Sequence, residues 1–258
     1  MATSARLETQ QATVLITRPT AQAKHFAGQC KALGFNVSLL PCIDIQACDL
    51  PVNELMLELQ AHRKVLFTSA NAVHAAHTLV PFPWKAHSVY AIGGATADVL
   101  RSYTQALCIE PVAPYNSESC LEQLCQQEPD RLLIAKGEGG RKLLADTLVE
   151  KHWQISTIDL YQRTLPDLSY QQIASAIAEN KPDIVCVSSN EILSNLCRLA
   201  GAHLNVLKQC PIITNSQRCL ELARSLGFIN EIFVATPAGD QGQLKCLNDW
   251  RKSIERDR

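Results

Sequence analysis

Six short segments rich in Gly, Ser, Thr and Asn stand where a predicted buried strand passes into a predicted helix. They begin at Thr17, Thr68, Gly93, Gly137, Ser188 and Thr214. Strand-to-helix turns of parallel sheets gather at the carboxyl ends of the strands, where ligands bind. The first turn of each helix offers free backbone N–H groups and the positive end of the helix dipole, and both favour an anion. Together, the six turns predict a site that holds several carboxylates or phosphates.

The same residue types also have a purely structural explanation. Ser, Thr and Asn are the ordinary N-cap residues of helices. Ser188 with Glu191, and Ser119 with Glu122, have the spacing of a capping box. For any single turn, capping is the simpler interpretation, and it is the number of turns that favours a binding site.

The segment Gly137-Glu-Gly-Gly-Arg141 is too irregular to be a nucleotide loop. It has neither the Gly-x-x-x-x-Gly-Lys-Ser/Thr order of a phosphate loop nor the Gly-x-Gly-x-x-Gly spacing of a dinucleotide site. Arg141 falls in a first helical turn, where the helix dipole disfavours a cation, so an anionic partner is expected for it. The alternative is a surface arginine paired with Glu138 or Asp146.

The sequence shows no recognisable metal set or disulfide framework. Its 11 cysteines include no Cys-x-x-Cys pair, and an odd number without a secretion signal indicates free thiols in a reducing compartment. His74 and His77 are three residues apart, but no nearby thiol or carboxylate completes a metal site. We expect neither a metal nor a cofactor.

Composition excludes several classes of protein. Lys and Arg together number 24 against 25 for Asp and Glu, so no surface for nucleic acid is expected. The longest apolar runs are far shorter than the roughly 20 residues that cross a bilayer. The stretch Met1–Ala12 is polar and lacks the apolar core of a signal peptide. We expect a cytoplasmic protein and, without an obvious dimer patch, a monomer.

Predicted strands alternate with predicted helices along the whole chain. The strands occupy 14–17, 35–40, 65–67, 89–92, 132–135, 155–161, 184–187, 212–214 and 232–234. This alternation is typical of parallel sheets with helical crossovers, and 258 residues suit one large or two smaller α/β domains.

An internal repeat favours two domains. The segment from Val14 resembles the one from Leu132, at an offset of 118. Phe67-Thr-Ser-Ala resembles Val187-Ser-Ser-Asn at an offset of 120, and Ile92-Gly-Gly-Ala-Thr resembles the segment from Ile212 at the same offset. Three matches in order indicate a duplicated unit. The repeat leaves open whether the chain is cut in half or whether its first part returns to pack with its last.

Four motifs resemble those of the uroporphyrinogen-III synthases, in order, from about Thr13 to Leu247. They are Val14-Leu-Ile-Thr-Arg-Pro, Phe67-Thr-Ser-Ala-Asn-Ala-Val, Tyr90-Ala-Ile-Gly-Gly-Ala-Thr-Ala and Leu160-Tyr-Gln-Arg-Thr. The resemblance implies two similar three-layer α/β/α domains with five-stranded parallel sheets in flavodoxin-like order, joined by a two-stranded ribbon. Domain 1 would be discontinuous, from about 12–41 and 166–258, and domain 2 would span 44–162, with linkers near 41–44 and 162–166. The ligand cleft would lie between them.

The reaction that the resemblance implies is cyclisation of hydroxymethylbilane to uroporphyrinogen III in haem biosynthesis, with inversion of ring D and loss of water. The enzyme would be a carbon–oxygen lyase that needs no cofactor. The linear tetrapyrrole carries several carboxylates, which suits the array of helix N-termini. A transient contact with the upstream hydroxymethylbilane synthase would deliver it.

The resemblance also implies which residues act. Tyr161 matches the tyrosine that assists departure of the substrate hydroxyl, since a phenol is protonated at neutral pH; packing in the linker is the alternative. The expected substrate contacts are Arg18, Ser69, Asn71, Gly94, Thr96, Gly137, Arg141, Ser188, Ser189, Asn190 and Ser216. For Arg18, a purely structural role is the alternative to substrate contact. The turn at Thr214 lacks the glycine that is common in the family. Lys136 stands where arginine is frequent, and a lysine keeps the charge but cannot bind a carboxylate in bidentate fashion.

Two other classes stay open on the residues alone. One is a non-catalytic two-domain binder of small anions, which the turn chemistry would equally suit. The other is a flavodoxin-like or nucleotide-binding enzyme, which the missing phosphate motifs disfavour. A tyrosine in the linker, Tyr161, favours the synthase.

Overall fold

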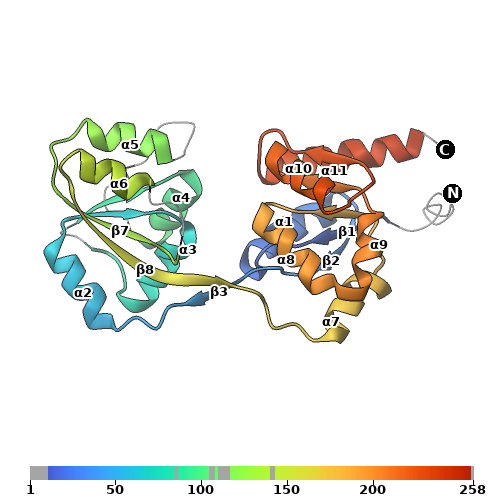
Figure 1. Ribbon diagram of the computed structural model, residues 1–258, viewed down its shortest axis with the longest axis horizontal. Helices are drawn as coiled ribbons and strands as arrows, with labels where there is room; N and C mark the ends of the chain where they lie inside the picture. The colour runs from blue at the N-terminus through green and yellow to red at the C-terminus, as the bar shows by residue number, and fades with distance from the viewer. Residues whose placement is uncertain (1–10, 85–86, 105–107, 110–116, 140–142, 257–258) are drawn as a thin grey trace. The chain divides into compact units, whose positions relative to one another are not determined.

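The computed structural model describes residues 11–84, 87–104, 108–109, 117–139 and 143–256. The chain divides into two compact units, each with its own sheet and helices (Figure 1). Unit 1 takes Met1–Asp44 and Thr164–Arg258, and unit 2 takes Ile45–Arg163. The first part of the chain therefore packs with the last part, which is the returning arrangement that the repeat had left open.

Unit 1 contains a five-stranded parallel sheet in the order β11-β10-β9-β1-β2. Its strands are β1 (Thr13–Ile16), β2 (Asn36–Leu39), β9 (Ile184–Cys186), β10 (Ile212–Thr214) and β11 (Ile232–Val234). Numbered along the chain, the order is 2-1-3-4-5, so the flavodoxin-like prediction is confirmed for this unit. Its helices are α1 (Thr20–Ala32), α7 (Tyr170–Ala174), α8 (Asn190–Ala200), α9 (Leu204–Lys208), α10 (Gln217–Ser225) and α11 (Asp240–Arg256).

Unit 2 contains six strands in the order β3-β8-β7-β4-β5-β6, one more than predicted. They are β3 (Asp44–Ala47), β4 (Lys64–Phe67), β5 (Ser88–Ala91), β6 (Cys108–Ile109), β7 (Arg131–Gly137) and β8 (Gln154–Thr164). The extra strand is β3, which pairs with the long β8 where the chain passes from one unit to the other and so forms the expected ribbon (Figure 1). The helices are α2 (Val52–Ala61), α3 (Ala70–Leu79), α4 (Gly94–Tyr103), α5 (Ser117–Cys125) and α6 (Leu143–Glu150).

The two sheets have the same spatial order once the repeat is used to match their strands. Spatial neighbours β8-β7-β4-β5-β6 correspond to β2-β1-β9-β10-β11. Val14 pairs with Ile184 in one sheet, and Leu132 pairs with Lys64 in the other, which fits the predicted offsets of 118 and 120. Unit 2 is therefore a permuted copy of unit 1, with chain order 3-2-1-4-5 across its five parallel strands.

The third predicted match is out of register by three residues. Val65 pairs with Val89, whereas Val185 pairs with Ile212, so the structural offset here is 123 and not 120. The connection that precedes β10 contains additional short helices, Gly201–His203 and α9, which account for the longer spacing. The residue equivalent to Gly93 is therefore Ser216, and both lie at the start of a helix.

The repeat extends to backbone conformation. Gly34 and His152 occupy matching positions after α1 and α6, with φ of 81° and 65°. Each is followed by a buried aromatic residue, Phe35 or Trp153. A left-handed conformation is natural for glycine and unfavourable for histidine, so the local fold imposes it on His152.

In unit 2, successive side chains of β4 point to opposite faces of the sheet. Val65 and Phe67 pack with residues of α2, α3 and α4, whereas Leu66 packs with residues of α5 and α6. Helices therefore cover both faces, and the unit has three layers. In unit 1, Phe26 of α1 and Trp250 of α11 belong to one cluster with the strand residues of one face.

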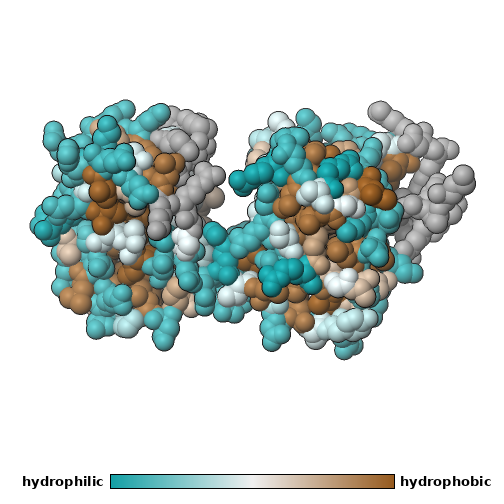
Figure 2. Space-filling model, viewed as in Figure 1, coloured by the Kyte–Doolittle hydropathy of each residue, from teal (hydrophilic) through white to brown (hydrophobic). Residues whose placement is uncertain are grey.

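Hydrophobic and hydrophilic residues are mixed over the visible surface (Figure 2). Among the described residues, no helix combines the length and apolar character needed to cross a membrane.

Candidate functional site

Three serines at the predicted turns are helix N-caps. The hydroxyl oxygens of Ser69, Ser189 and Ser216 accept hydrogen bonds from the N–H groups of Ala72, Ile192 and Cys219, at 3.1, 3.2 and 3.2 Å. Capping is thus correct for each of them, but it uses only one donor of the first helical turn. The other N–H groups of a first helical turn have no intrahelical partner, so they suit a ligand.

The capping boxes predicted from spacing are absent at these two places. Ser188 precedes the cap, which is Ser189, and Ser119 lies inside α5 and not before it. The spacing was misleading because Ser occurs twice in succession at 188–189, and only the geometry decides which of the two caps α8.

Tyr161 is buried, with 2% of its surface exposed, and its hydroxyl lies 3.0 Å from the hydroxyl oxygen of Ser69. The tyrosine comes from β8, and the serine begins α3, so the fold joins two predicted site residues that are 92 positions apart. A phenol held by a hydroxyl group at this distance can exchange or orient a proton.

Gly137 lies against the ring of Tyr161. A Cβ atom at position 137 would fall 2.5 Å from Cζ of the ring, which no side chain can occupy without moving the tyrosine. The register between β7 and β8 shifts here, because Lys136 pairs with Asp159 and Gly137 pairs with Tyr161. Gly137 is therefore required by the close approach of the ring and not by a phosphate loop.

Arg163, which is not among the predicted contacts, also lies near the tyrosine. Its Nη2 donates to the hydroxyl oxygen of Tyr161 at 3.5 Å, and its Cζ lies 5.9 Å from the ring centroid. The spacing could have indicated it, because residues two apart on a strand point to the same face.

Lys136 is engaged within unit 2. Its ammonium group lies 2.5 Å from a carboxylate oxygen of Asp159 and donates to the carbonyl of Gly139 at 3.1 Å. The positive charge near this turn is thus neutralised. Arg141, which is predicted to contact substrate, lies outside the described residues.

The other predicted contacts of unit 2 lie in the first turns of their helices. Asn71 is half-buried at the start of α3, Gly94 opens α4, and the side chain of Thr96 is buried. Apart from its chain neighbours and its own helix, no heavy atom of the described residues lies within 4 Å of a Cβ placed at Gly94, so packing does not require glycine there.

In unit 1, Arg18 points inward. Only 6% of the residue is exposed, its Nη1 forms an ion pair with Asp240, and Nη2 donates to Gln243 at 2.6 Å. Its Cζ lies 4.0 Å from the ring centroid of Phe26. These contacts favour the structural alternative for Arg18 over direct contact with substrate.

The remaining predicted contacts of unit 1 are accessible. Ser188, Ser189 and Asn190 are half-buried, and Ser216 is exposed. Beside Ser216, the side-chain oxygen of Asn215 is buried without a hydrogen-bond partner in the described part of the chain. Asn215 is a second polar group at this turn and is not among the predicted contacts.

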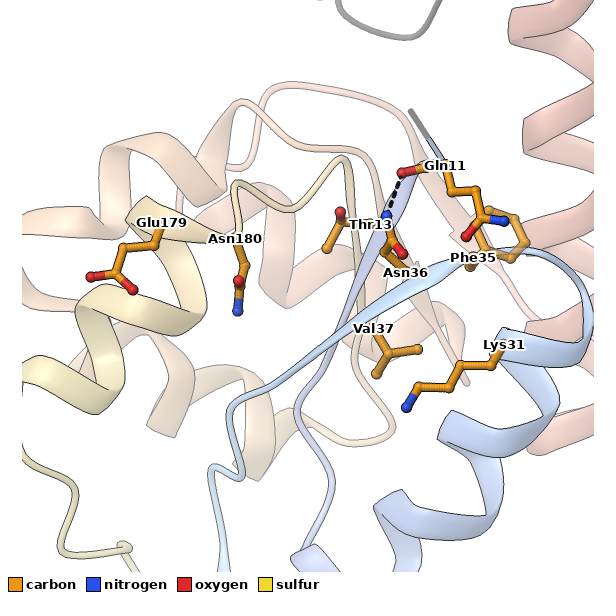
Figure 3. A pocket seen from close by; sticks show the side chains of 8 residues that line it. All are labelled: Gln11, Thr13, Lys31, Phe35, Asn36, Val37, Glu179 and Asn180. Atoms are coloured by element: carbon orange, nitrogen blue, oxygen red, sulfur yellow. Dashed lines mark hydrogen bonds between the residues drawn. The ribbon is translucent and has the colours of Figure 1, made fainter. Parts of the chain in front are cut away.

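A cavity of about 670 Å³ lies elsewhere, near the beginnings of β1 and β2 (Figure 3). Thr13, Asn36 and Glu179 contribute to its walls, and the amide of Asn36 donates to the carbonyl of Gln11 at 3.0 Å. Because the cavity is at the amino ends of these strands, none of the predicted site residues lines it. Within the described residues, no group of three or more His, Cys, Asp or Glu side chains is placed to hold a metal.

Comparison with known proteins connects this geometry to one family. A model of the family described as uroporphyrinogen-III synthase HemD matches residues 24–240. The uroporphyrinogen-III synthase of Salmonella typhimurium is 28% identical over 244 residues, which cover 91% of this chain and 99% of that protein. The corresponding protein of Escherichia coli is 26% identical over 249 residues, with the same shares of the two chains.

Solved structures agree at the level of the fold. The crystal structure of uroporphyrinogen-III synthetase from Helicobacter pylori covers 93% of this chain and 100% of its own, with a TM-score of 0.65 and 15% identity. A mutant uroporphyrinogen III synthase from Thermus thermophilus covers 96% of this chain and 100% of its own, with a TM-score of 0.55 and 16% identity. With the family model matching most of the chain, this chain belongs to the uroporphyrinogen-III synthase HemD family, the hydro-lyases of tetrapyrrole biosynthesis.

Proposed function

We propose that the uroporphyrinogen-III synthase activity of this chain depends on Tyr161 as the proton donor and on helix N-termini of both units as carboxylate-binding groups. The substrate is hydroxymethylbilane, which is closed with inversion of ring D and loss of water. The observation that carries the proposal is the contact of Tyr161 with Ser69, 3.0 Å apart.

We expect backbone N–H groups, and not a cluster of cationic side chains, to bind the many carboxylates of the substrate. The chain has a formal net charge of −1, and Arg18 and Lys136 each have a carboxylate partner within their own unit. The helices α3, α4, α8 and α10 each follow a parallel strand, and the first turn of a helix has N–H groups without an intrahelical partner. Such groups bind anions by hydrogen bonding and by the helix dipole, so the protein needs no net positive charge.

The arrangement around Tyr161 supplies two donors to its oxygen. Because the oxygen of Ser69 accepts the N–H of Ala72, the serine hydrogen can point to Tyr161. The guanidinium of Arg163 donates to the same phenolic oxygen. With these two donors in place, the phenolic hydrogen is left to the departing hydroxyl group of the substrate, and both donors stabilise the oxygen as the proton leaves.

In the first step, the C–O bond of the hydroxymethyl group breaks, and the hydroxyl takes the proton of Tyr161 and leaves as water. The remaining azafulvenium cation is attacked by the substituted carbon of ring D, which gives a spiro intermediate. This intermediate fragments and recloses with ring D inverted, and the proton released as the pyrrole regains aromaticity restores Tyr161. The pyrroles supply most of the reactivity, so the main task of the protein is to position the chain.

A coupled assay tests the proposal. Hydroxymethylbilane is generated by its upstream synthase, this protein is added, and the oxidised type I and type III isomers are separated. We expect mainly type III with wild type. Tyr161→Phe should lower kcat by about 100-fold while KM changes little, because general acid catalysis contributes about 10²- to 10⁴-fold. A Tyr161→Phe variant with full kcat would remove the tyrosine from the mechanism.

The anion-binding alternative gives a different result in the same assay. With a protein that only binds carboxylates, the type I isomer would be the only product, in the same amount as in the control without protein. The cytoplasmic location, the monomeric state and the transient contact with the upstream synthase stay predictions.

A further inference from the structure

We infer that Gln243 is a positioning residue for the Ser188–Asn190 turn and that Arg18 and Asp240 hold Gln243 in place. The inference rests on the proposed function, because it assumes that this turn binds a carboxylate of the substrate. It assigns a function to two buried residues, Arg18 and Gln243.

Gln243 lies in the first turn of α11 with no exposed surface. Its Nε2 donates to the carbonyl of Val187 at 3.1 Å, and its Oε1 accepts from Nη2 of Arg18 at 2.6 Å. A guanidinium can only donate and a carbonyl can only accept, so these two partners determine the orientation of the amide. The side chain is thus held at both ends.

Val187 is the last residue before the serine turn. Its N–H donates to the carbonyl of Ile213 at 2.9 Å, and its own carbonyl lies beyond the end of β9. The preceding carbonyl, of Cys186, accepts from the hydroxyl of Thr17 at 2.7 Å. Side chains from α11 and from the turn between β1 and α1 therefore hold the backbone at the point where it leaves the sheet.

The equivalent turn of unit 2 shows that this carbonyl needs a donor. Phe67 corresponds to Val187, and its carbonyl accepts the backbone N–H of Ile92 at 3.0 Å. In unit 1 the donor is the side chain of Gln243. An unpaired buried carbonyl would be costly, so unit 1 depends on a side chain where unit 2 uses its backbone.

Arg18 fixes Gln243 from the other side. Its Nη1 pairs with Asp240, three residues before Gln243 on the same helix, and its planar group lies over Phe26. A buried guanidinium is stable only when it is paired, and here one carboxylate and one amide of the same helical turn supply the partners. The ion pair thus anchors the beginning of α11 to the β1–α1 turn.

The decisive variant is Gln243→Glu. It keeps an acceptor for Arg18 and removes the donor to Val187, so it breaks the link to the serine turn while the link to Arg18 stays. We expect KM for hydroxymethylbilane to rise about tenfold, with kcat within about twofold of wild type. Gln154→Glu is the matched control, because Gln154 also accepts from an arginine, Arg131, but on an exposed surface at the amino ends of β7 and β8. Its KM should equal that of wild type.

A double-mutant cycle separates positioning from a general effect on folding. Ser189→Ala removes the cap of the turn, and if Gln243 acts through that turn, the two changes in KM are less than additive. Arg18→Lys provides a second route, because it keeps the charge and loses the fork that reaches both Asp240 and Gln243; it should raise KM in the same direction.

Three results would overturn the inference. They are a wild-type KM in Gln243→Glu, an equal rise in KM in the Gln154→Glu control, or full additivity of the KM changes of Gln243→Glu and Ser189→Ala. A lower thermal midpoint with unchanged KM would assign Gln243 a purely structural function and would equally overturn it. Failure of the proposed function is distinct, because wild type itself would then form no type III isomer.

Discussion

Gly137 supports the ring of Tyr161 so closely that a Cβ atom at position 137 would lie 2.5 Å from Cζ. Glycine here is a packing requirement of the proposed proton donor. The register between β7 and β8 shifts at the same place, between Lys136 and Gly137.

Gly137→Ala should therefore displace Tyr161 from Ser69. We expect kcat to fall about 10- to 100-fold and the free energy of unfolding to fall by about 1–3 kcal/mol, as for other overpacked sites. The measurements are the coupled isomer assay and urea unfolding. Gly28→Ala is the control, because outside its own helix no heavy atom in the described part of the chain lies within 4 Å of a Cβ at that position. Wild-type kcat in Gly137→Ala would show that the ring position does not matter.

Ser69 and Tyr161 should act as a pair. Ser69→Ala and Tyr161→Phe should each lower kcat, and the double variant should lose little more than the worse single variant. Loss of the Ser69 cap also costs about 1 kcal/mol of stability, which has to be separated from catalysis. Ser169→Ala provides this control, because Ser169 caps α7 by accepting from Gln172 and is not among the predicted contacts. Independent effects of Ser69→Ala and Tyr161→Phe on kcat would argue against a shared proton.

Buried thiols should make the protein less stable at alkaline pH. Burial raises the pKa of Cys30 to about 12 and the pKa of Cys120 to about 11, from 9.0. Above pH 9 the unfolded chain releases these protons while the folded chain keeps them, so the free energy of unfolding falls as pH rises. Each such thiol contributes a slope of about 1.4 kcal/mol per pH unit until the folded pKa is reached.

The check is urea unfolding at pH 8 and at pH 10. Cys30→Ala should lower the loss of stability between the two pH values, whatever its effect at pH 8. An identical loss in the variant and the wild type would mean that Cys30 titrates at its ordinary pKa in the folded protein.

Replacing His152 with glycine should stabilise the protein. His152 has φ of 65°, and its counterpart in the repeat, Gly34, has the same left-handed conformation. His152→Gly should raise the free energy of unfolding by up to about 1 kcal/mol, because it relieves this strain. Lys151→Gly is the comparison, since Lys151 does not have positive φ and glycine there should only destabilise. A loss of stability in His152→Gly would show that its side-chain contacts outweigh the strain.

The sequence by itself determined the α/β class, the strand-to-helix turns and the duplication. Buried strands and helical spacing are local patterns, and the offsets of 118 and 120 between segments such as Val14 and Leu132 need no knowledge of packing. The third offset was wrong by three residues because a longer connection before Ile212 shifts the strand while the sequence similarity stays weak.

Only the tertiary structure decided which part of the chain packs with which. It also decided which polar groups have partners inside the protein. Arg18 looked like a ligand for an anion, but contacts with Asp240 and Gln243, more than 220 positions away, turn it inward. Likewise, the contact between Ser69 and Tyr161 depends on how β8 returns beside β7. Such pairings arise from long-range packing, which leaves no local pattern in the sequence.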